Sequence, residues 1–115
     1  FPDALNYAGT LFGGKLLAEM DLAAANSARR LLYGTKFDGL VTAHLSEVDF
    51  VNPAFLGDIV ELRTRVSRLG KSSITLRVSA HSESLVGDRT HICEASFVMV
   101  ALKDGKPFDH GKRKL

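Results

Sequence analysis

The residue in this sequence that most clearly indicates chemistry is a single carboxylate, Asp21, within a predicted amphipathic helix. Apolar residues recur at the spacing of one buried helical face, namely Leu16, Leu17, Met20, Ala24, Ala28, Leu31 and Leu32. Asp21 follows Leu17 by one turn, so it falls on this stripe and we expect it to be partly desolvated. Because burying an unpaired charge is costly, such a carboxylate is either paired or used in catalysis. The alternative is that Asp21 lies at the edge of the stripe or caps a neighbouring loop.

Two glycines, Gly13 and Gly14, stand at the expected start of this helix. The first amides of a helix have no partner inside it and carry the positive end of its dipole. Glycine lets a ligand approach this backbone closely. The pair therefore predicts an oxyanion hole, in which backbone amides stabilise a carbonyl oxygen that gains negative charge. The simpler interpretation is a flexible turn with a glycine N-cap.

The elements that must position these groups can be predicted from periodicity. Gly34 is expected to end the helix. Alternating residues then predict strands at 41–51, 59–69, 74–81 and 90–103. In the first strand, the apolar residues change from one side to the other near Glu47, which indicates a bulge. The last strand has apolar residues on both faces, as expected of a strand that is buried on both faces. One helix followed by antiparallel strands predicts an α+β fold with the helix on one face of the sheet, and residues 106–115 are expected to form a polar, basic tail.

The order of residues around Asp21 is more specific than any single feature. From Asn6 to Ala24 the chain reads N-x-x-G-T-x-F-G-G-x-L-L-x-x-M-D-x-A-A. This run resembles the signature of the hotdog-fold acyl-CoA thioesterases, and the resemblance continues through Val48–Asp58 and Gly70–Ile74. It implies a hotdog fold, in which a curved antiparallel sheet wraps one long helix, and hydrolysis of the thioester of a fatty acyl-CoA.

The resemblance also implies roles for individual residues. Asn6 and Asp21 match the family's catalytic pair, which two subunits usually contribute across a dimer, with Asp21 as general base or nucleophile. Without the resemblance, Asn6 would be interpreted as a turn residue. The basic turn after residue 67 lies along the family's coenzyme A path, so contact with coenzyme A is expected from Arg68, Gly70, Lys71, Ser72 and Ser73. Otherwise this turn is a solvated hairpin end.

The same resemblance sets expectations for the partners and the extent of the chain. Acyl-CoA is the expected small-molecule substrate, and coenzyme A enters as part of it, so no separate cofactor is expected. Hotdog subunits form at least homodimers, and these commonly assemble into tetramers or hexamers. The family's first strand would lie just before Phe1, so that strand is expected to be missing from this sequence. The alternative of a longer protein with two hotdog domains, of which this chain is one, stays open.

Composition limits the remaining possibilities. A chain of 115 residues with 45% hydrophobic and 24% charged residues is expected to be one globular domain, residues 1–115. The net charge of +2 is too small to indicate nucleic acid, although it suits a polyanionic ligand. Cys93 is the only cysteine, which fits a reducing compartment, so we expect a cytoplasmic protein. No apolar run has the length of a membrane span.

Other chemistry is less well supported by the sequence. The four histidines, His44, His81, His91 and His110, show no metal-site spacing, and most are expected at the surface or on strand faces. Cys93 is interpreted as a buried small residue. A hotdog hydratase or dehydratase would need a histidine in the loop before the helix, and none is there. A non-catalytic acyl-CoA-binding module would be expected to lack Asn6 or Asp21, and both are present.

Overall fold

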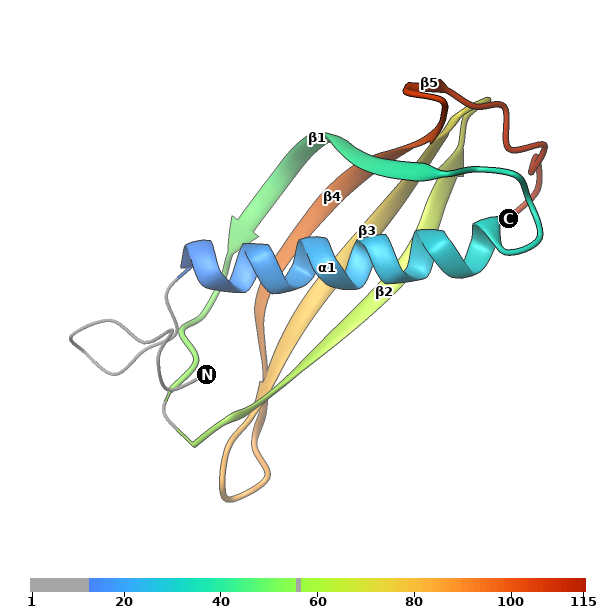
Figure 1. Ribbon diagram of the computed structural model, residues 1–115. Helices are drawn as coiled ribbons and strands as arrows, with labels where there is room; N and C mark the ends of the chain where they lie inside the picture. The colour runs from blue at the N-terminus through green and yellow to red at the C-terminus, as the bar shows by residue number, and fades with distance from the viewer. Residues whose placement is uncertain (1–12, 56) are drawn as a thin grey trace.

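The computed structural model describes residues 13–55 and 57–115 (Figure 1). The elements in chain order are α1 (Gly13–Leu32), β1 (Gly39–Phe50), β2 (Ile59–Leu69), β3 (Ser73–Glu83), β4 (Arg89–Lys103) and β5 (Lys106–Pro107). All neighbouring strands are antiparallel, in the order β1-β4-β3-β2, and β5 pairs with β4. The predicted order of one helix followed by antiparallel strands is confirmed, and the two-residue strand β5 adds to it.

Helix α1 forms where the apolar spacing predicts it. Its buried residues, Leu16, Met20, Ala24, Ala28 and Leu32, are separated by four residues each and line one face. Gly34 ends the helix with a φ of 87°, a left-handed conformation that favours glycine. The amide of Thr35 then donates to the carbonyl of Leu32 at 3.0 Å, which satisfies one of the last helix acceptors.

The helix crosses one face of the sheet and shares a single apolar core with it (Figure 1). Alternate residues of β3 that face the helix are buried, namely Ile74, Leu76, Val78 and Ala80. In β4 the consecutive residues Ala95, Ser96 and Phe97 are all buried. On the face of β4 away from the helix Ser96 is buried, but Glu94, Val98 and Val100 are only partly buried, so the expected burial of this strand on both faces holds only in part.

Strand β1 contains the predicted bulge. Its register against β4 shifts between Ser46 and Asp49, and Glu47 between them has a φ of 51°. A second shift lies between Thr42 and His44. The extra residues change which side chains face the helix, so Thr42 pairs with Met99 on the helix side while Asp49 pairs with Glu94 on the opposite side.

The chain after β5 differs from the expected basic tail. His110 is only 4% exposed, so it is the exception to the expectation that most of the histidines lie at the surface or on strand faces. Its amide donates to the carbonyl of Lys71, and its Nε2 lies 3.0 Å from the carbonyl of Ser73. These contacts fasten the tail to the turn between β2 and β3. Within the part of the chain that the structure describes, no helix is both long and apolar enough to cross a membrane.

Candidate active site

Asp21 lies two turns into α1, above the edge strand β1. The hydroxyl of Thr42 donates a hydrogen bond of 2.6 Å to Oδ1 of Asp21, and the same hydroxyl lies 3.3 Å from Sδ of Met99. The carboxylate is half-buried in the single chain. Its position on the border of the apolar stripe therefore combines partial desolvation with a specific hydrogen-bond donor.

Thr42 is the residue that sequence reasoning missed. It lies 21 positions after Asp21, and nothing local connects the two. The sequence does show a hydroxyl residue in the predicted strand directly after the helix. Because β1 contains two register shifts, its alternation of residues does not tell which face of the strand turns toward the helix. The neighbouring Met99 is buried and fixes Thr42 from the β4 side.

The start of α1 lies against Phe50, at the end of β1. A Cβ atom at Gly13 would be 3.0 Å from two carbons of the Phe50 ring, closer than a side chain tolerates without displacing that ring. A cavity of about 340 Å³ opens beside this contact and is lined by Gly13, Phe50, Val51, Asn52 and Pro53. The absence of a side chain at Gly13 therefore lets the Phe50 ring pack against the first turn, next to a hollow in the surface.

The structure does not bring all the predicted site residues together within one chain. Asp21 lies eight positions after Gly13, which is about 12 Å along a helix axis. Asn6 lies outside the described residues, and Gly14 is an exposed residue of the first turn. The helix start and the Asp21 carboxylate of one chain are therefore too far apart to act on the same carbonyl group.

The predicted coenzyme A turn lies at the other end of the sheet. Ser73 is in register with Val100, and Val100 with Val41, near the start of β1. Gly13 adjoins Phe50 at the end of that strand, and twelve residues of β1 span about 36 Å at 3.3 Å per residue. Arg68 and Lys71 are exposed, and Gly70, Ser72 and Ser73 are half-buried. The five turn residues therefore form one surface, which in a single chain is remote from the helix start.

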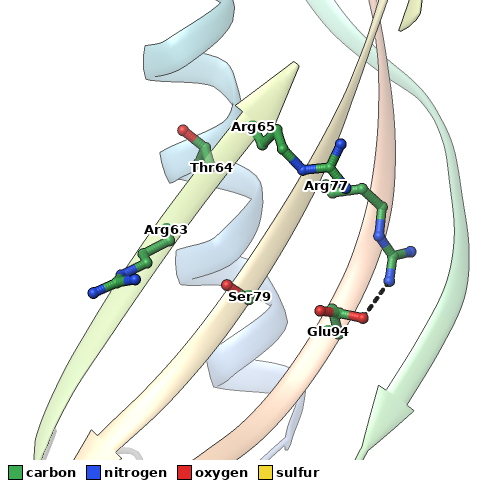
Figure 2. A pocket seen from close by; sticks show the side chains of 6 residues that line it. All are labelled: Arg63, Thr64, Arg65, Arg77, Ser79 and Glu94. Carbon is green, nitrogen blue, oxygen red and sulfur yellow. Dashed lines mark hydrogen bonds and ion pairs between the residues drawn. The ribbon is translucent and has the colours of Figure 1, made fainter. Parts of the chain in front are cut away.

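The face of the sheet away from α1 carries most of the ionic contacts. Arg77 donates to Glu94 at 2.7 Å and to Glu47 at 3.1 Å. Figure 2 shows Arg77 extending toward Glu94 over a cavity of about 270 Å³, which Arg63, Thr64, Arg65, Arg77, Ser79 and Glu94 line. Near it, hydrogen bonds from Arg63 and Arg89 hold the pKa of Glu61 below its usual value.

Among the described residues, neither Cys93 nor the pair of His81 and His91 forms a second reaction centre. Burial raises the pKa of the Cys93 thiol, which makes it a poor nucleophile and agrees with its predicted role as a buried small residue. His81 stacks on His91 with 4.9 Å between ring centroids, and burial is the main cause that lowers the pKa of His81. Among the residues described, no three His, Cys, Asp or Glu side chains gather as metal ligands.

The sequence is similar to those of known proteins. Residues 8–87 match the family model of the thioesterase superfamily. The acyl-CoA thioester hydrolase YciA of Salmonella typhimurium is 31% identical over 111 residues, which cover 92% of this chain and 80% of that protein.

Solved structures of other proteins are also similar to the chain. A hexameric thioesterase from Yersinia pestis is 33% identical with a TM-score of 0.85, over 95% of this chain and 87% of that one. A hexameric hotdog-fold thioesterase of Campylobacter jejuni is 31% identical with a TM-score of 0.82, over 95% of this chain and 83% of that one. The match to the family model, the identity and the shared arrangement of one helix across a curved antiparallel sheet agree, and the chain is therefore a hotdog-fold member of the thioesterase superfamily.

Proposed function

We propose that this protein is an acyl-CoA thioesterase that hydrolyses a fatty acyl-CoA to a free fatty acid and coenzyme A. Membership of the thioesterase superfamily and the likeness to acyl-CoA thioester hydrolase YciA support the reaction class. The observation that carries the proposal is the half-buried carboxylate of Asp21, which the Thr42 hydroxyl orients over the sheet edge. A carboxylate in this position can activate water or attack a carbonyl carbon.

In this mechanism Thr42 engages Oδ1 of Asp21, and Oδ2 has no hydrogen bond among the described residues. As general base, Asp21 takes a proton from a water whose oxygen bonds to the thioester carbonyl carbon. The C–S bond then breaks, and the coenzyme A thiolate recovers the proton. Direct attack by the carboxylate followed by hydrolysis of the anhydride is the second route. Because a thiolate is a good leaving group, neither route needs a strong general acid or a metal, and coenzyme A is part of the substrate.

We propose that two chains complete each site. The amides near Gly13 and Gly14 stabilise the developing negative charge on the carbonyl oxygen, and Asn6 orients the water or polarises the carbonyl. These groups come from one chain and Asp21 from another, because the helix start lies about 12 Å from Asp21 along the axis. Strand β1, beneath Asp21, pairs with β4 alone in the described sheet, so a second chain can approach there.

The turn between β2 and β3 is proposed to contact the nucleotide or the pantetheine of coenzyme A. Arg68 and Lys71 supply exposed positive charge, and the hydroxyls of Ser72 and Ser73 supply hydrogen-bond donors. The backbone of this turn is held by two contacts, since Ser72 accepts from the amide of Ala101 and Lys71 from the amide of His110. A turn fixed in this way binds with less loss of conformational freedom.

The proposal also covers assembly and location. We take residues 1–115 as one catalytic domain that works as a homodimer at least, and a tetramer or hexamer is consistent with relatives that are themselves hexameric. Cytoplasmic action is proposed because the only cysteine of the chain is an unpaired, buried thiol, which fits a reducing compartment.

The first test is release of coenzyme A thiol from acyl-CoAs of short to long chain, for the wild type beside Asp21→Asn. The amide keeps the shape of the side chain and removes its basicity, so turnover is expected to fall by at least about a hundredfold while acyl-CoA still binds. Asp38→Asn, which changes an exposed carboxylate outside the site, is the matched control.

Each other outcome has a defined meaning. Unchanged turnover in Asp21→Asn would exclude Asp21 as base or nucleophile. A folded wild type that binds acyl-CoA without turnover would instead support a non-catalytic acyl-CoA-binding module, and hydration of an enoyl-CoA would support a hydratase. Turnover that survives exhaustive chelation is expected, since the mechanism uses no metal.

A further inference from the structure

The sheet face opposite α1, here called the outer face, contains a small cavity whose lining is mostly positive. The cavity measures about 270 Å³, and its lining residues are Arg63, Thr64, Arg65, Arg77, Ser79 and Glu94. Figure 2 shows this part of the sheet, with α1 behind it and Arg65 extending from β2 toward Arg77 on β3. Three guanidinium groups and one carboxylate therefore border the same hollow.

Two of these arginines already have carboxylate partners. Arg77 donates to Glu94 at 2.7 Å and to Glu47 at 3.1 Å. Arg63 donates to Glu61. These ion pairs hold both guanidinium groups in place, and they neutralise Glu94, the carboxylate in the lining of the cavity. An anion that enters the cavity therefore meets an acid that an arginine already balances.

Arg65 is the arginine of the lining whose charge is not balanced. It is exposed and has no ionic partner among the described residues. It is also the register partner of Arg77, and like charges directly opposite each other destabilise a sheet. Asp49, an exposed carboxylate on the same face, lies on β1 at the other edge of the sheet. Three strand spacings, about 14 Å, exceed the screening length of about 8 Å at physiological salt, so Asp49 does not offset this repulsion.

A bulge in β2 places a second unpaired arginine beside the first. The register of β2 against β3 shifts between Val66 and Arg68, and Arg68 is paired with Thr75. Thr75 lies two residues before Arg77 and shares its face, so Arg68 is on the outer face about 7 Å along the strand from Arg65. Arg68 is exposed and has no ionic partner within the part of the chain that the structure describes. The bulge thus turns two neighbouring arginines toward the same side of the sheet.

The size of the cavity and its neutral donor indicate the kind of anion. Ser79 lies between Arg63 and Glu94 in Figure 2, and its hydroxyl makes no hydrogen bond to another described residue. The planar fork of arginine matches the oxygens of a phosphate group. A volume of about 270 Å³ is just below the roughly 300–1,000 Å³ typical of sites for whole small molecules. The cavity therefore suits one phosphate or diphosphate group better than a whole nucleotide.

We infer that the outer-face cavity binds a phosphate group, with Arg65 as its main ligand and with Arg77 and the Ser79 hydroxyl as further donors. The two unpaired guanidinium groups match the charge of about −1.5 to −2 that a phosphate monoester carries at neutral pH. The cavity lies across the sheet from Asp21, so it is separate from the proposed reaction centre of the same chain. The phosphate group belongs either to coenzyme A, whose proposed turn begins at Arg68, or to a free phosphate compound.

The test is the affinity for inorganic pyrophosphate by isothermal titration calorimetry at about 50 mM salt. The wild type is expected to bind it, and to bind it more weakly at about 500 mM salt. Arg65→Ser is expected to weaken binding by at least about tenfold, because it removes the unbalanced guanidinium group. Arg65→Lys keeps the charge without the fork and is expected to fall between the two. Arg30→Ser removes an equal charge from an exposed position on α1 and is the control.

A second titration identifies the source of the phosphate group. If coenzyme A supplies it, saturating coenzyme A abolishes the binding of pyrophosphate that depends on Arg65. In that case Arg65→Ser also raises KM for an acyl-CoA but not for the matching acyl-pantetheine, which has no phosphate. If the ligand is a free phosphate compound, pyrophosphate binds equally well with and without coenzyme A.

Three results would overturn the inference. One is equal pyrophosphate affinity in the wild type and Arg65→Ser, and another is an equal loss in Arg65→Ser and Arg30→Ser, which would show a response to net charge alone. The third is a wild type that binds no pyrophosphate at low salt. Circular dichroism verifies folding, and if Arg65→Ser does not fold, Arg65→Lys must bind more weakly than Arg30→Lys. Calorimetry needs no turnover, so an inactive enzyme that binds pyrophosphate through Arg65 would contradict only the proposed hydrolysis.

Discussion

The hydroxyl of Thr42 lies 2.6 Å from Oδ1 of Asp21, so the strand after the helix supplies a donor to the carboxylate that the helix presents. The contact exists because α1 packs across β1 and because Thr42 faces the helix in register with Met99. It gives Asp21 one defined orientation, and it makes Thr42 a positioning residue in the proposed mechanism.

Replacing Thr42 by valine keeps the shape of the side chain and removes the donor. A hydrogen bond to a charged group contributes about 1.5–3 kcal/mol, so kcat is expected to fall about 10- to 150-fold with little change in KM. Thr42→Ser retains a hydroxyl and is expected to recover most of kcat. Steady-state kinetics with one acyl-CoA checks this, and equal kcat values for the valine and serine variants would contradict the role assigned to the hydroxyl.

Gly13→Ala tests the contact at the helix start. The added Cβ would meet the far end of the exposed Phe50 ring at 3.0 Å, so the ring must shift, and the folded state is expected to lose less than about 1 kcal/mol. Combining it with Phe50→Leu removes the ring and is expected to recover part of this loss. Urea unfolding of both single variants and the double variant measures the coupling, and strictly additive effects would show that the ring is not the obstacle.

Acid is expected to destabilise the fold through His81. Burial is the main cause that lowers the pKa of His81 from 6.5, and the charges of Arg89, His91 and Arg63 lower it further. The carboxylate of Glu61 has the smallest effect and raises this pKa. The Nδ1 of His81 is buried and has no hydrogen-bond partner among the residues that the structure describes. The unfolded chain therefore binds a proton at a higher pH than the fold does, and stability falls as pH drops below about 6.5 toward the folded pKa.

The measurement for His81 is the free energy of unfolding between about pH 8 and about pH 5. His81→Gln should flatten the dependence, because the glutamine does not titrate, whereas His44→Gln at an exposed position should leave it unchanged. The carboxylate of Glu94 lies 3.8 Å from the ring of His91, and both residues are unchanged in the two variants. A difference between the two pH dependences is therefore due to His81. An unaltered slope in His81→Gln would contradict the assignment.

His110→Ala is expected to loosen the proposed coenzyme A turn. The amide of Lys112 donates to Nδ1 of His110, so the proton is on Nε2, which donates to the carbonyl of Ser73. Losing these bonds costs about 1–3 kcal/mol of stability and should raise KM for acyl-CoA more than it lowers kcat. Arg113→Ala removes the exposed pair with Asp109 and a hydrogen bond to the carbonyl of Lys112, neither of which contacts the turn, and is the control. An unchanged KM in His110→Ala would separate the tail from substrate binding.

The helix and strands could be predicted because their signals are local. The four-residue spacing from Leu16 to Leu32 and the glycine at Gly34 need no knowledge of the rest of the chain. Strand β2 has the bounds that alternation predicted, and the switch in pattern at Glu47 marked a real bulge. The order of the strands in the sheet was not predicted, since alternation says which side of a strand is apolar and not which strand lies next to it.

The sequence by itself determined the family, the position of Asp21 on the border of the apolar stripe and the glycines at the helix start. These depend on spacing along the chain, which the order of residues states directly. Only the tertiary structure decided that Thr42 holds Asp21, that His110 fastens the turn at Ser73 and that Arg65 and Asp49 lie on opposite edges of one face. Each of these three relationships depends on how the helix crosses the sheet or on the register of the strands. Side chains that are distant in sequence meet only where the packing of the common core brings their backbones together.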